Sequence, residues 1–479
     1  MQKKYILVTS ILFLLSITYL FYHSCKRDTV VIKPQERVSI PDSSWLYGSL
    51  NFEQLRKDIA WSSILNGDFT KLFQTDTSSN TLLAILKSPS SYSIVEQNNI
   101  QYFSICKNQH VYTGLLFSLE NKEQLIQAFK STAYTVGSNT QHSFRTNEGY
   151  WLYNDHNLLF IGKQYQDSLL AHSFFNQTNH TTIIPRTNDS TYAVCTINTQ
   201  YYQDSTMHPM FDSASIYIQL KKNTTCVDID WKYSGVATAF FNQTSLIKPN
   251  DPNGFYLTLN PTTIGLQKAI DVYQQKATNR KKQSLNVTAF ISFLQNNTAI
   301  VEFNGWKKIK NSFFTSVLND EFEMVLVKKD SSYLEPSFRF EVNQHNTKNT
   351  LPFLTYLHKE GLISNNTESP FAITLGNFDS ELIVLKDSTF VYQNKHADII
   401  KRSGTTQEGV FILQLKPAFI QGLKSQRNIT IEEKYKLIDM VQVEAFKENS
   451  TLEGNIKVFF SDEKHPIISS IQLFKNQPK

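Results

Sequence analysis

The chain has 479 residues, of which 41% are hydrophobic and 13% aromatic, and its formal net charge is +5. This length and apolar content provide for one or two folded cores and exclude a mainly disordered protein. The 34 Phe and 22 Tyr favour strands, and the 16 Gly form neither of the common glycine-rich phosphate-binding motifs. The nucleotide-binding classes that depend on those motifs are therefore not indicated.

The amino-terminal residues have the pattern of an export signal. Lys3 and Lys4 precede an almost uninterrupted apolar run over residues 5–22, which as a helix is roughly long enough to cross a bilayer. The run is longer than the core of a cleaved signal peptide and lacks small residues at the cleavage position. We therefore expect an uncleaved signal anchor over residues 1–30, with a transmembrane helix at about 5–22. The N-terminus would be cytoplasmic and the ectodomain periplasmic or extracellular.

Cys25 allows a second interpretation, in which the protein is a lipoprotein acylated at this cysteine. The three residues before it, Tyr22, His23 and Ser24, match the lipoprotein pattern only at the last position. Both interpretations predict attachment to a membrane.

Three further cysteines, Cys106, Cys195 and Cys226, follow in the ectodomain. One disulfide could form in an oxidising compartment, and Cys195 with Cys226 is the natural choice, although the pairing stays open. No CxxC motif is present, so neither zinc-ribbon nor thioredoxin chemistry is indicated.

A strand, an Asn and then a helix recur along the ectodomain. Residues 45–50 predict a strand, Asn51 a helix N-cap, and Gln54 the partner that completes a capping box. The same arrangement returns at similar separations twice more in the first half and three times in the second, at Asn121, Asn198, Asn260, Asn343 and Lys416. At Asn260 the following Pro261 would take the first helical position, where proline is tolerated.

Two more elements agree in order between the halves. Residues 157–170 in the first half correspond to residues 388–401 in the second, and each half ends in a segment that predicts a hairpin. These matches predict an internal duplication.

The predicted organisation is a linker at 31–39, a first α+β lobe at 40–248 and a second α+β lobe at 249–479. Each lobe would be an antiparallel sheet with helices packed on one face. Residues 247–254, rich in Pro, Asn, Asp and Gly, have the turn chemistry of a junction.

The segment IPDSSWLYGSLNFEQL at residues 40–55 combines a proline-led turn, an apolar strand, an Asn and an amphipathic helix behind the anchor. With its second related lobe, the chain resembles a group of uncharacterised, membrane-anchored envelope proteins of the Bacteroidota type. The resemblance implies a tethered envelope protein and supplies no catalytic residues.

No catalytic, cofactor-binding or metal-ligating residue is predicted. Asp228 and Asp230 would share one face of a strand about 6 to 7 Å apart, a spacing that glycosidases and metal sites use, but the favoured interpretation is a solvated polar face. Cys195 lies within a predicted strand, which favours a buried thiol. The histidines show no metal-binding spacing; His142, His156, His172, His180 and His396 fall in separate elements.

Two basic clusters stand out, residues 280–282 and the group Lys307, Lys308 and Lys310. In an exported protein we expect them to be solvated loops, and no nucleic-acid partner is predicted.

The favoured function is a non-enzymatic, membrane-tethered envelope protein with a binding or scaffolding ectodomain, whose partner is another envelope protein or a surface polymer. Two alternatives stay open: a carrier or sensor of an apolar ligand, and an envelope hydrolase with a dispersed active site.

Overall fold

The computed structural model describes part of the chain. The described residues are 40, 43–55, 57–59, 95–96, 99–107, 110–130, 143–145, 149–153, 155–162, 187, 190–202, 214–249, 254–268, 293–295, 297–343, 352, 355, 359, 364–366, 369–375, 378–384, 389–394, 402–416, 437–462 and 464–475. The chain divides into two compact units, unit 1 (Met1–Val236 with Asn455–Lys479) and unit 2 (Ala237–Gly454). The linear division at 248 and 249 stays a prediction.

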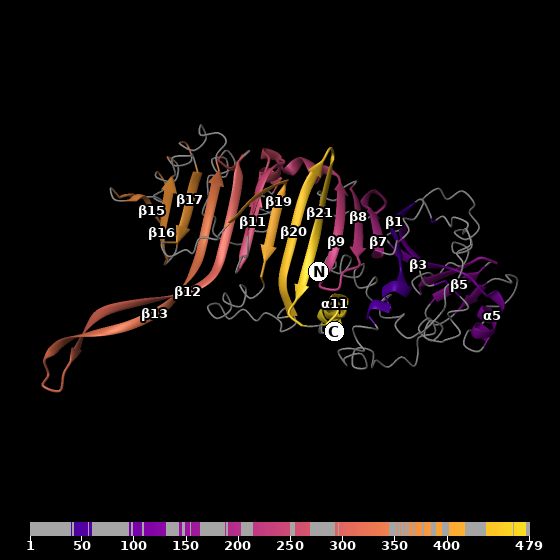
Figure 1. Ribbon diagram of the computed structural model, residues 1–479, viewed down its shortest axis with the longest axis horizontal. Coiled ribbons are helices and arrows are strands. Elements are labelled where there is room, and N and C mark those ends of the chain that lie inside the picture. The colour runs from indigo at the N-terminus through magenta and orange to yellow at the C-terminus, as the bar shows by residue number, and fades with distance from the viewer. Residues whose placement is uncertain are drawn as a thin grey trace. The chain divides into compact units, whose positions relative to one another are not determined.

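Unit 1 is built on an antiparallel sheet (Figure 1). Its strands run in the order β4–β5–β6–β3–β2–β1–β7–β8–β9, and β9 also pairs with β21. Their bounds are β1 (Ser44–Leu50), β2 (Ile100–Lys107), β3 (His110–Ser118), β4 (Ser143–Arg145), β5 (Gly149–Tyr153), β6 (Asn157–Gly162), β7 (Thr191–Asn198), β8 (Ser215–Lys221) and β9 (Cys226–Ser234). Of β21 (Thr451–Phe460), residues 455–460 belong to unit 1.

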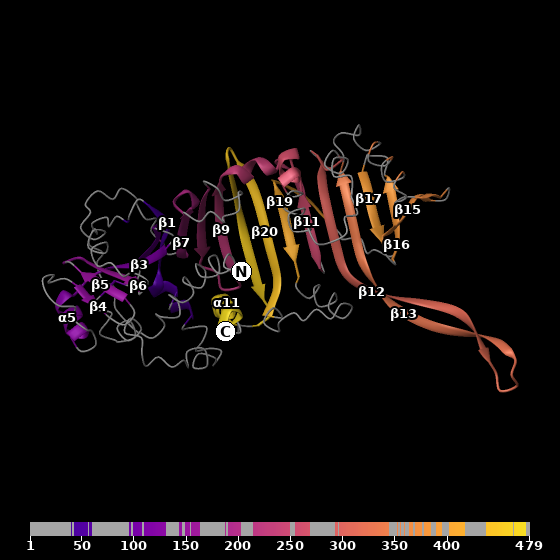
Figure 2. The same ribbon diagram turned by 180° about the vertical axis from the view of Figure 1, so that it is seen from behind.

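Unit 2 also contains an antiparallel sheet, which Figure 2 shows from behind. The order is β14–β15–β16–β17–β13–β12–β11–β19–β20, and β10 with β18 forms a separate pair. The bounds are β10 (Thr244–Pro249), β11 (Phe255–Leu259), β12 (Thr298–Leu318), β13 (Met324–Asn343), β14 (Ser364–Asn366), β15 (Ser369–Leu375), β16 (Phe378–Val384), β17 (Thr389–Asn394), β18 (Arg402–Gly409), β19 (Phe411–Leu415) and β20 (Ile438–Glu448).

The strand pairings of the two units follow the same order. In unit 1, β1 lies between β2 and β7, and β3 leads through β6 to β5. In unit 2, β11 lies between β12 and β19, and β13 leads through β17 to β16. Strands β6 and β17 lie in the segments 157–170 and 388–401, which correspond between the two halves of the sequence. Two copies of one ancestral unit would have this relation.

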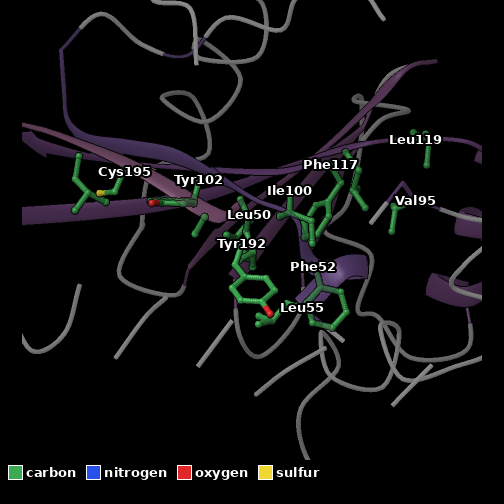
Figure 3. Packing of buried hydrophobic residues seen from close by; sticks show 14 of the residues in the cluster. Leu50, Phe52, Leu55, Val95, Ile100, Tyr102, Phe117, Leu119, Tyr192 and Cys195 are labelled. Carbon is green, nitrogen blue, oxygen red and sulfur yellow. The ribbon is translucent and has the colours of Figure 1, made fainter. Parts of the chain in front are cut away.

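The core of unit 1 forms because its central strand is apolar on both faces. β1 is buried along nearly its whole length, and Leu50 lies in one buried cluster with Ile100 of β2, Phe117 of β3 and Tyr192 of β7 (Figure 3). A β-carbon at Gly48 would lie 2.0 Å from the carbonyl oxygen of Val194. The hydroxyl of Tyr102 donates a hydrogen bond of 2.9 Å to that same oxygen, so only glycine fits beside it.

Two of the predicted helix caps are confirmed. Asn51 Oδ1 accepts a hydrogen bond of 3.1 Å from the N–H of Gln54, and Asn121 Oδ1 accepts one of 3.0 Å from the N–H of Gln124. Helical residues 52–55 and 57–59 follow the first cap, and α5 (Lys122–Lys130) follows the second. The capping box at Gln54 is wrong, because its side-chain amide donates to Asp58 instead.

The other predicted caps differ. Asn198 makes no side-chain cap bond and precedes only the 3-10 turn η2 (Thr199–Tyr201). After Asn260 the cap is Thr262, whose hydroxyl accepts from the N–H of Gly265 at 3.2 Å. The residues that follow Asn343 and Lys416 directly lie outside the described part of the chain.

The α+β fold class is wrong. The described residues are mostly strand, with few and short helices, so the helix-covered lobes are replaced by extended antiparallel sheets. The expected terminal hairpins are also wrong: their second segments form the 3-10 helix η4 (Val236–Phe240) and the helix α11 (Pro466–Lys475). Pro466 stands at the first helical position, where its missing N–H costs nothing, and His465 precedes it as N-cap.

The membrane assignment is also corrected. Among the described residues, no helix is long and apolar enough to cross a bilayer, which conflicts with the predicted transmembrane helix and single-pass topology. The predicted anchor at 1–30, with Cys25, and the linker at 31–39 lie outside the described residues. We therefore assign no membrane span.

Replacing Asn51 or Asn121 by Ala should lower the free energy of unfolding by about 1 kcal/mol, because a helix N–H loses its acceptor. Asn198→Ala is the matched control, since Asn198 also stands at the end of a strand but makes no cap bond. Its effect in urea unfolding should stay within about 0.5 kcal/mol. Equal losses for Asn51→Ala and Asn198→Ala would contradict the capping role.

Candidate functional site

The most exposed part of unit 2 is a long two-stranded ribbon, residues 306–336, which we call the arm. Strand β12 pairs with β11 only over residues 299–303, and β13 pairs with β17 only over residues 339–343. Beyond these positions the two strands pair with each other from Trp306 and Pro336 to Leu318 and Met324. No other described strand pairs with the arm, and Figures 1 and 2 show it extending beyond the sheet of unit 2.

The arm leaves the sheet at a β-bulge. The register between β12 and β13 shifts between Phe303 and Trp306, and Gly305 has a φ of 88°. An extra residue in one strand bends the ladder and increases its twist, and glycine accepts this positive φ without steric cost. The bulge therefore changes the direction of β12 and β13 at the point where their pairing with the rest of the sheet ends.

The counterpart hairpin in unit 1 has no such extension. β2 and β3, which hold the places of β12 and β13, turn back directly after the pair Lys107 and His110. The arm is thus an elongation of the second hairpin only.

The tip of the arm is an ordered turn. Asn319 Oδ1 accepts hydrogen bonds from the N–H groups of Glu321, at 3.1 Å, and Glu323, at 2.7 Å. The N–H of Phe322 donates to the carbonyl oxygen of Asn319 at 3.0 Å, and Phe322 has a φ of 62°. This conformation is costly for an aromatic residue, and it leaves the Phe322 ring 83% exposed.

The distal half of the arm is apolar on both faces. Residues opposite each other in an antiparallel pair share a face, so Leu318 and Met324 lie on one face with Phe314 and Leu326. These four side chains are 53%, 67%, 68% and 70% exposed, respectively. The other face carries exposed Phe313, Val317, Val325 and Val327.

The charges of the arm are ordered along its length. The three lysines at its base, Lys307, Lys308 and Lys310, were expected in a solvated loop but lie on β12. The tip carries three exposed carboxylates, Asp320, Glu321 and Glu323. Lys328, Lys329 and Asp330 lie between, and Asp330 accepts a hydrogen bond from the hydroxyl of Ser312 at 2.6 Å.

Buried polar groups fix the base of the arm. Asn394 of β17 donates to Glu335 at 3.4 Å and accepts from the N–H of Phe338 at 3.3 Å. Arg339 pairs with Glu341 at 2.8 Å, and both side chains are largely buried. The two bonds of Asn394 hold β13 in one register against β17, whereas the Arg339–Glu341 pair lies within β13, so the arm projects from a defined point.

Asp228 and Asp230 lie together, as expected from their spacing, but Asp228 is buried rather than solvated. The side-chain amide of Asn455 contacts both carboxylates and donates to Asp230 at 2.9 Å. Asn223 donates to Asp228 at 3.3 Å, and Lys221 forms an ion pair with Asp230 at 2.6 Å. This set joins β9 to β21 and gives the aspartates a structural role.

The predicted Cys195–Cys226 disulfide is wrong. Cys106, Cys195 and Cys226 are free, and β8 lies between the strands that carry the last two. Burial raises the pKa of the Cys195 thiol to about 11, which leaves it unreactive as a nucleophile at neutral pH.

A buried polar cluster that the sequence did not indicate lies at the start of α11. Tyr192 donates to Asp58 at 2.8 Å, and Lys222 pairs with Asp58 at 3.2 Å. His465 Nε2 lies 3.5 Å from the Tyr192 hydroxyl, and His465 Nδ1 accepts from the N–H of Ile467 at 3.4 Å. Burial lowers the pKa of His465; Lys222 lowers it further and Asp58 opposes this. Burial raises the pKa of Tyr192, and its bond to Asp58 adds to this.

The remaining candidates do not form a site. The described residues hold no group of three or more His, Cys, Asp or Glu that could bind a metal. His156 is described, whereas His142, His172, His180, His396 and the basic cluster at 280–282 lie outside the described residues.

No protein-family model, no curated protein and no solved structure matches this chain. The resemblance to Bacteroidota-type envelope proteins stays a prediction.

The stability of unit 1 should fall as the pH drops below about 6.5, the ordinary pKa of histidine. The folded state lowers the pKa of His465, so it holds fewer protons than the unfolded state, and acid favours unfolding. His465→Asn keeps an N-cap acceptor without a titrating ring and should reduce the slope of unfolding free energy against pH between 7.5 and 5. Identical slopes for both proteins would exclude His465 as the source.

Proposed function

We propose that the protein is a non-enzymatic binding or scaffolding protein that engages its partner through the arm. The observation that carries this proposal is the exposure of large apolar side chains on both faces of the distal arm. Monomeric proteins rarely expose contiguous apolar patches of this kind, and such patches mark interaction sites. The proposal rests on this surface.

An uncovered arm leaves its large apolar side chains in contact with water. Burying one Leu, Phe or Met side chain is worth about 1.5 to 3 kcal/mol, and the distal arm presents several. An isolated two-stranded ribbon is itself only marginally stable in water. A partner that covers the apolar side chains would therefore both bind tightly and order the arm.

The backbone of the arm favours a protein partner. Both long edges of the ribbon lack a neighbouring strand among the described residues, so they can pair with an added strand. Hydrogen bonds along the edge would supply affinity, and the apolar side chains would supply specificity. A surface polymer without a peptide backbone and without apolar groups would neither pair with the edge strands nor cover the apolar side chains.

The double variant Phe314→Ser with Leu326→Ser should abolish partner binding and leave the fold intact. Both side chains are exposed, so the free energy of unfolding should change by no more than about 0.5 kcal/mol per substitution. Partners are measured by cross-linking of the tagged full chain in its native cells, followed by mass spectrometry.

Ile264→Ser is the matched control for these substitutions. Ile264 is 54% exposed in the same unit but lies outside the arm. The control should retain every partner that the native chain retains. Partners held equally by the arm variant and by the control would overturn the proposal.

A further inference from the structure

We infer that the arm binds a second copy of itself, with two arms lying antiparallel so that the tip of each meets the base of the other. The inference rests on the proposed role of the arm as the interaction element and names its partner. The order of charges and apolar groups along the ribbon supports this pairing.

The arm is self-complementary only when two copies run in opposite directions. Its base carries Lys308 and Lys310, and its tip carries Asp320, Glu321 and Glu323. A parallel pair would place lysines beside lysines and carboxylates beside carboxylates, which repel. An antiparallel pair places each acidic tip beside a basic base, twice in one dimer.

The positions along β12 fit this arrangement in detail. Asp320 and Lys308 lie at equal distances in sequence from Phe314, on opposite sides of it. When two arms align about Phe314, Asp320 of one arm faces Lys308 of the other, and Leu318 faces Lys310. The two Phe314 rings then meet at the centre.

The same alignment covers the apolar residues. Lys308 and Lys310 share a face with Phe314 and Leu318, because side chains two residues apart in a strand point to the same side. One face therefore carries both the charges and the most exposed apolar groups. Along β12 this face is basic at the base, apolar further out, and it ends at the acidic tip. On β13 the same face also carries Lys328 opposite Phe314 and Asp330 opposite Ser312.

A lipid surface is disfavoured as the occupant. The first part of the arm to reach a bilayer would be the tip, and its three carboxylates are costly to bring into hydrocarbon and are repelled by anionic headgroups. A different protein would need acidic groups opposite the base of the arm and basic groups opposite its tip. A second arm in the reversed direction already presents this order of charges.

Two antiparallel arms would form a closed dimer. The contact is isologous, so the same surface serves both copies and no further arm is left open. At about 3.3 Å per residue, the paired part of each arm is roughly 40 Å long.

The test exchanges charges between base and tip in the full-length protein. Sedimentation velocity at low ionic strength should show a dimer for the native chain, since salt screens exposed charges. The base variant Lys308→Glu with Lys310→Glu and the tip variant Asp320→Lys with Glu321→Lys should each raise the dimer dissociation constant at least about tenfold.

Mixing the two variants in equal amounts should restore the dimer. In the mixed pair, the acidic tip of the base variant meets the basic base of the tip variant, and the lysine tip meets the glutamate base. A chain carrying all four substitutions should also dimerise by itself. Lys268→Glu with Lys359→Glu, two exposed lysines of unit 2 outside the arm, is the control and should leave the dimer unchanged.

A monomeric native chain at about 100 μM, or a dimer unaffected by the reversals, would overturn the inference. These outcomes are separable from the proposed function. A monomeric chain that still loses a different protein partner with Phe314→Ser and Leu326→Ser keeps the binding role and refutes only the second copy. A native dimer that is weakened in each variant and restored by mixing the two variants supports both the binding function of the arm and its pairing with a second copy.

Discussion

The structure depends on pairing the backbone N–H and C=O groups of its strands. In each unit a central strand, β1 or β11, has a strand on both sides, and pairing continues outward from it. Around β1 the side chains above and below the ladder are apolar, so hydrogen bonding and burial support the same register. In the arm, hydrogen bonding and burial no longer act together. The two strands stay hydrogen-bonded to each other, but their apolar side chains are exposed and their outer edges have no neighbouring strand among the described residues.

Part of this architecture could be predicted from the sequence because it depends on local chemistry. Asn51 and Asn121 cap helices because the oxygen of a short amide side chain accepts a hydrogen bond from the backbone N–H three residues later in the chain. This bond does not depend on the surrounding structure. The recurrence of such local signals also located β6 and β17 at matching places. The prediction of an α+β fold was wrong because the apolar segments between these signals fit a buried helix and a buried strand equally well. Long-range strand pairing decides between the two.

The arm could not be recognised as a site from the sequence alone. Its distal segments read as ordinary core strands, and only the pairing over residues 306–336 shows that no layer covers them. One signal was present: apolar residues flank Asn319 and Asp320, the kind of turn residues that join hairpins. The cluster of lysines at 307, 308 and 310 predicted a solvated loop, but these residues lie on strand β12. The cluster of Asp58, Tyr192 and His465 was equally hidden, since its members come from three distant segments.

The comparison between the two units bears most directly on function. Strands β2 and β12 hold the same place in their sheets, and so do β3 and β13, but only the second pair runs on past the sheet edge. The folding of unit 1 shows that this topology is complete without an arm, so the extension is not needed to close the sheet. It adds exposed apolar groups, a positive φ at Phe322 and a bulge at Gly305, all of which lower stability in an isolated chain. An elongation that costs stability in the monomer, carries ordered charges and ends in a structured turn is best explained by a surface that is covered when the protein acts.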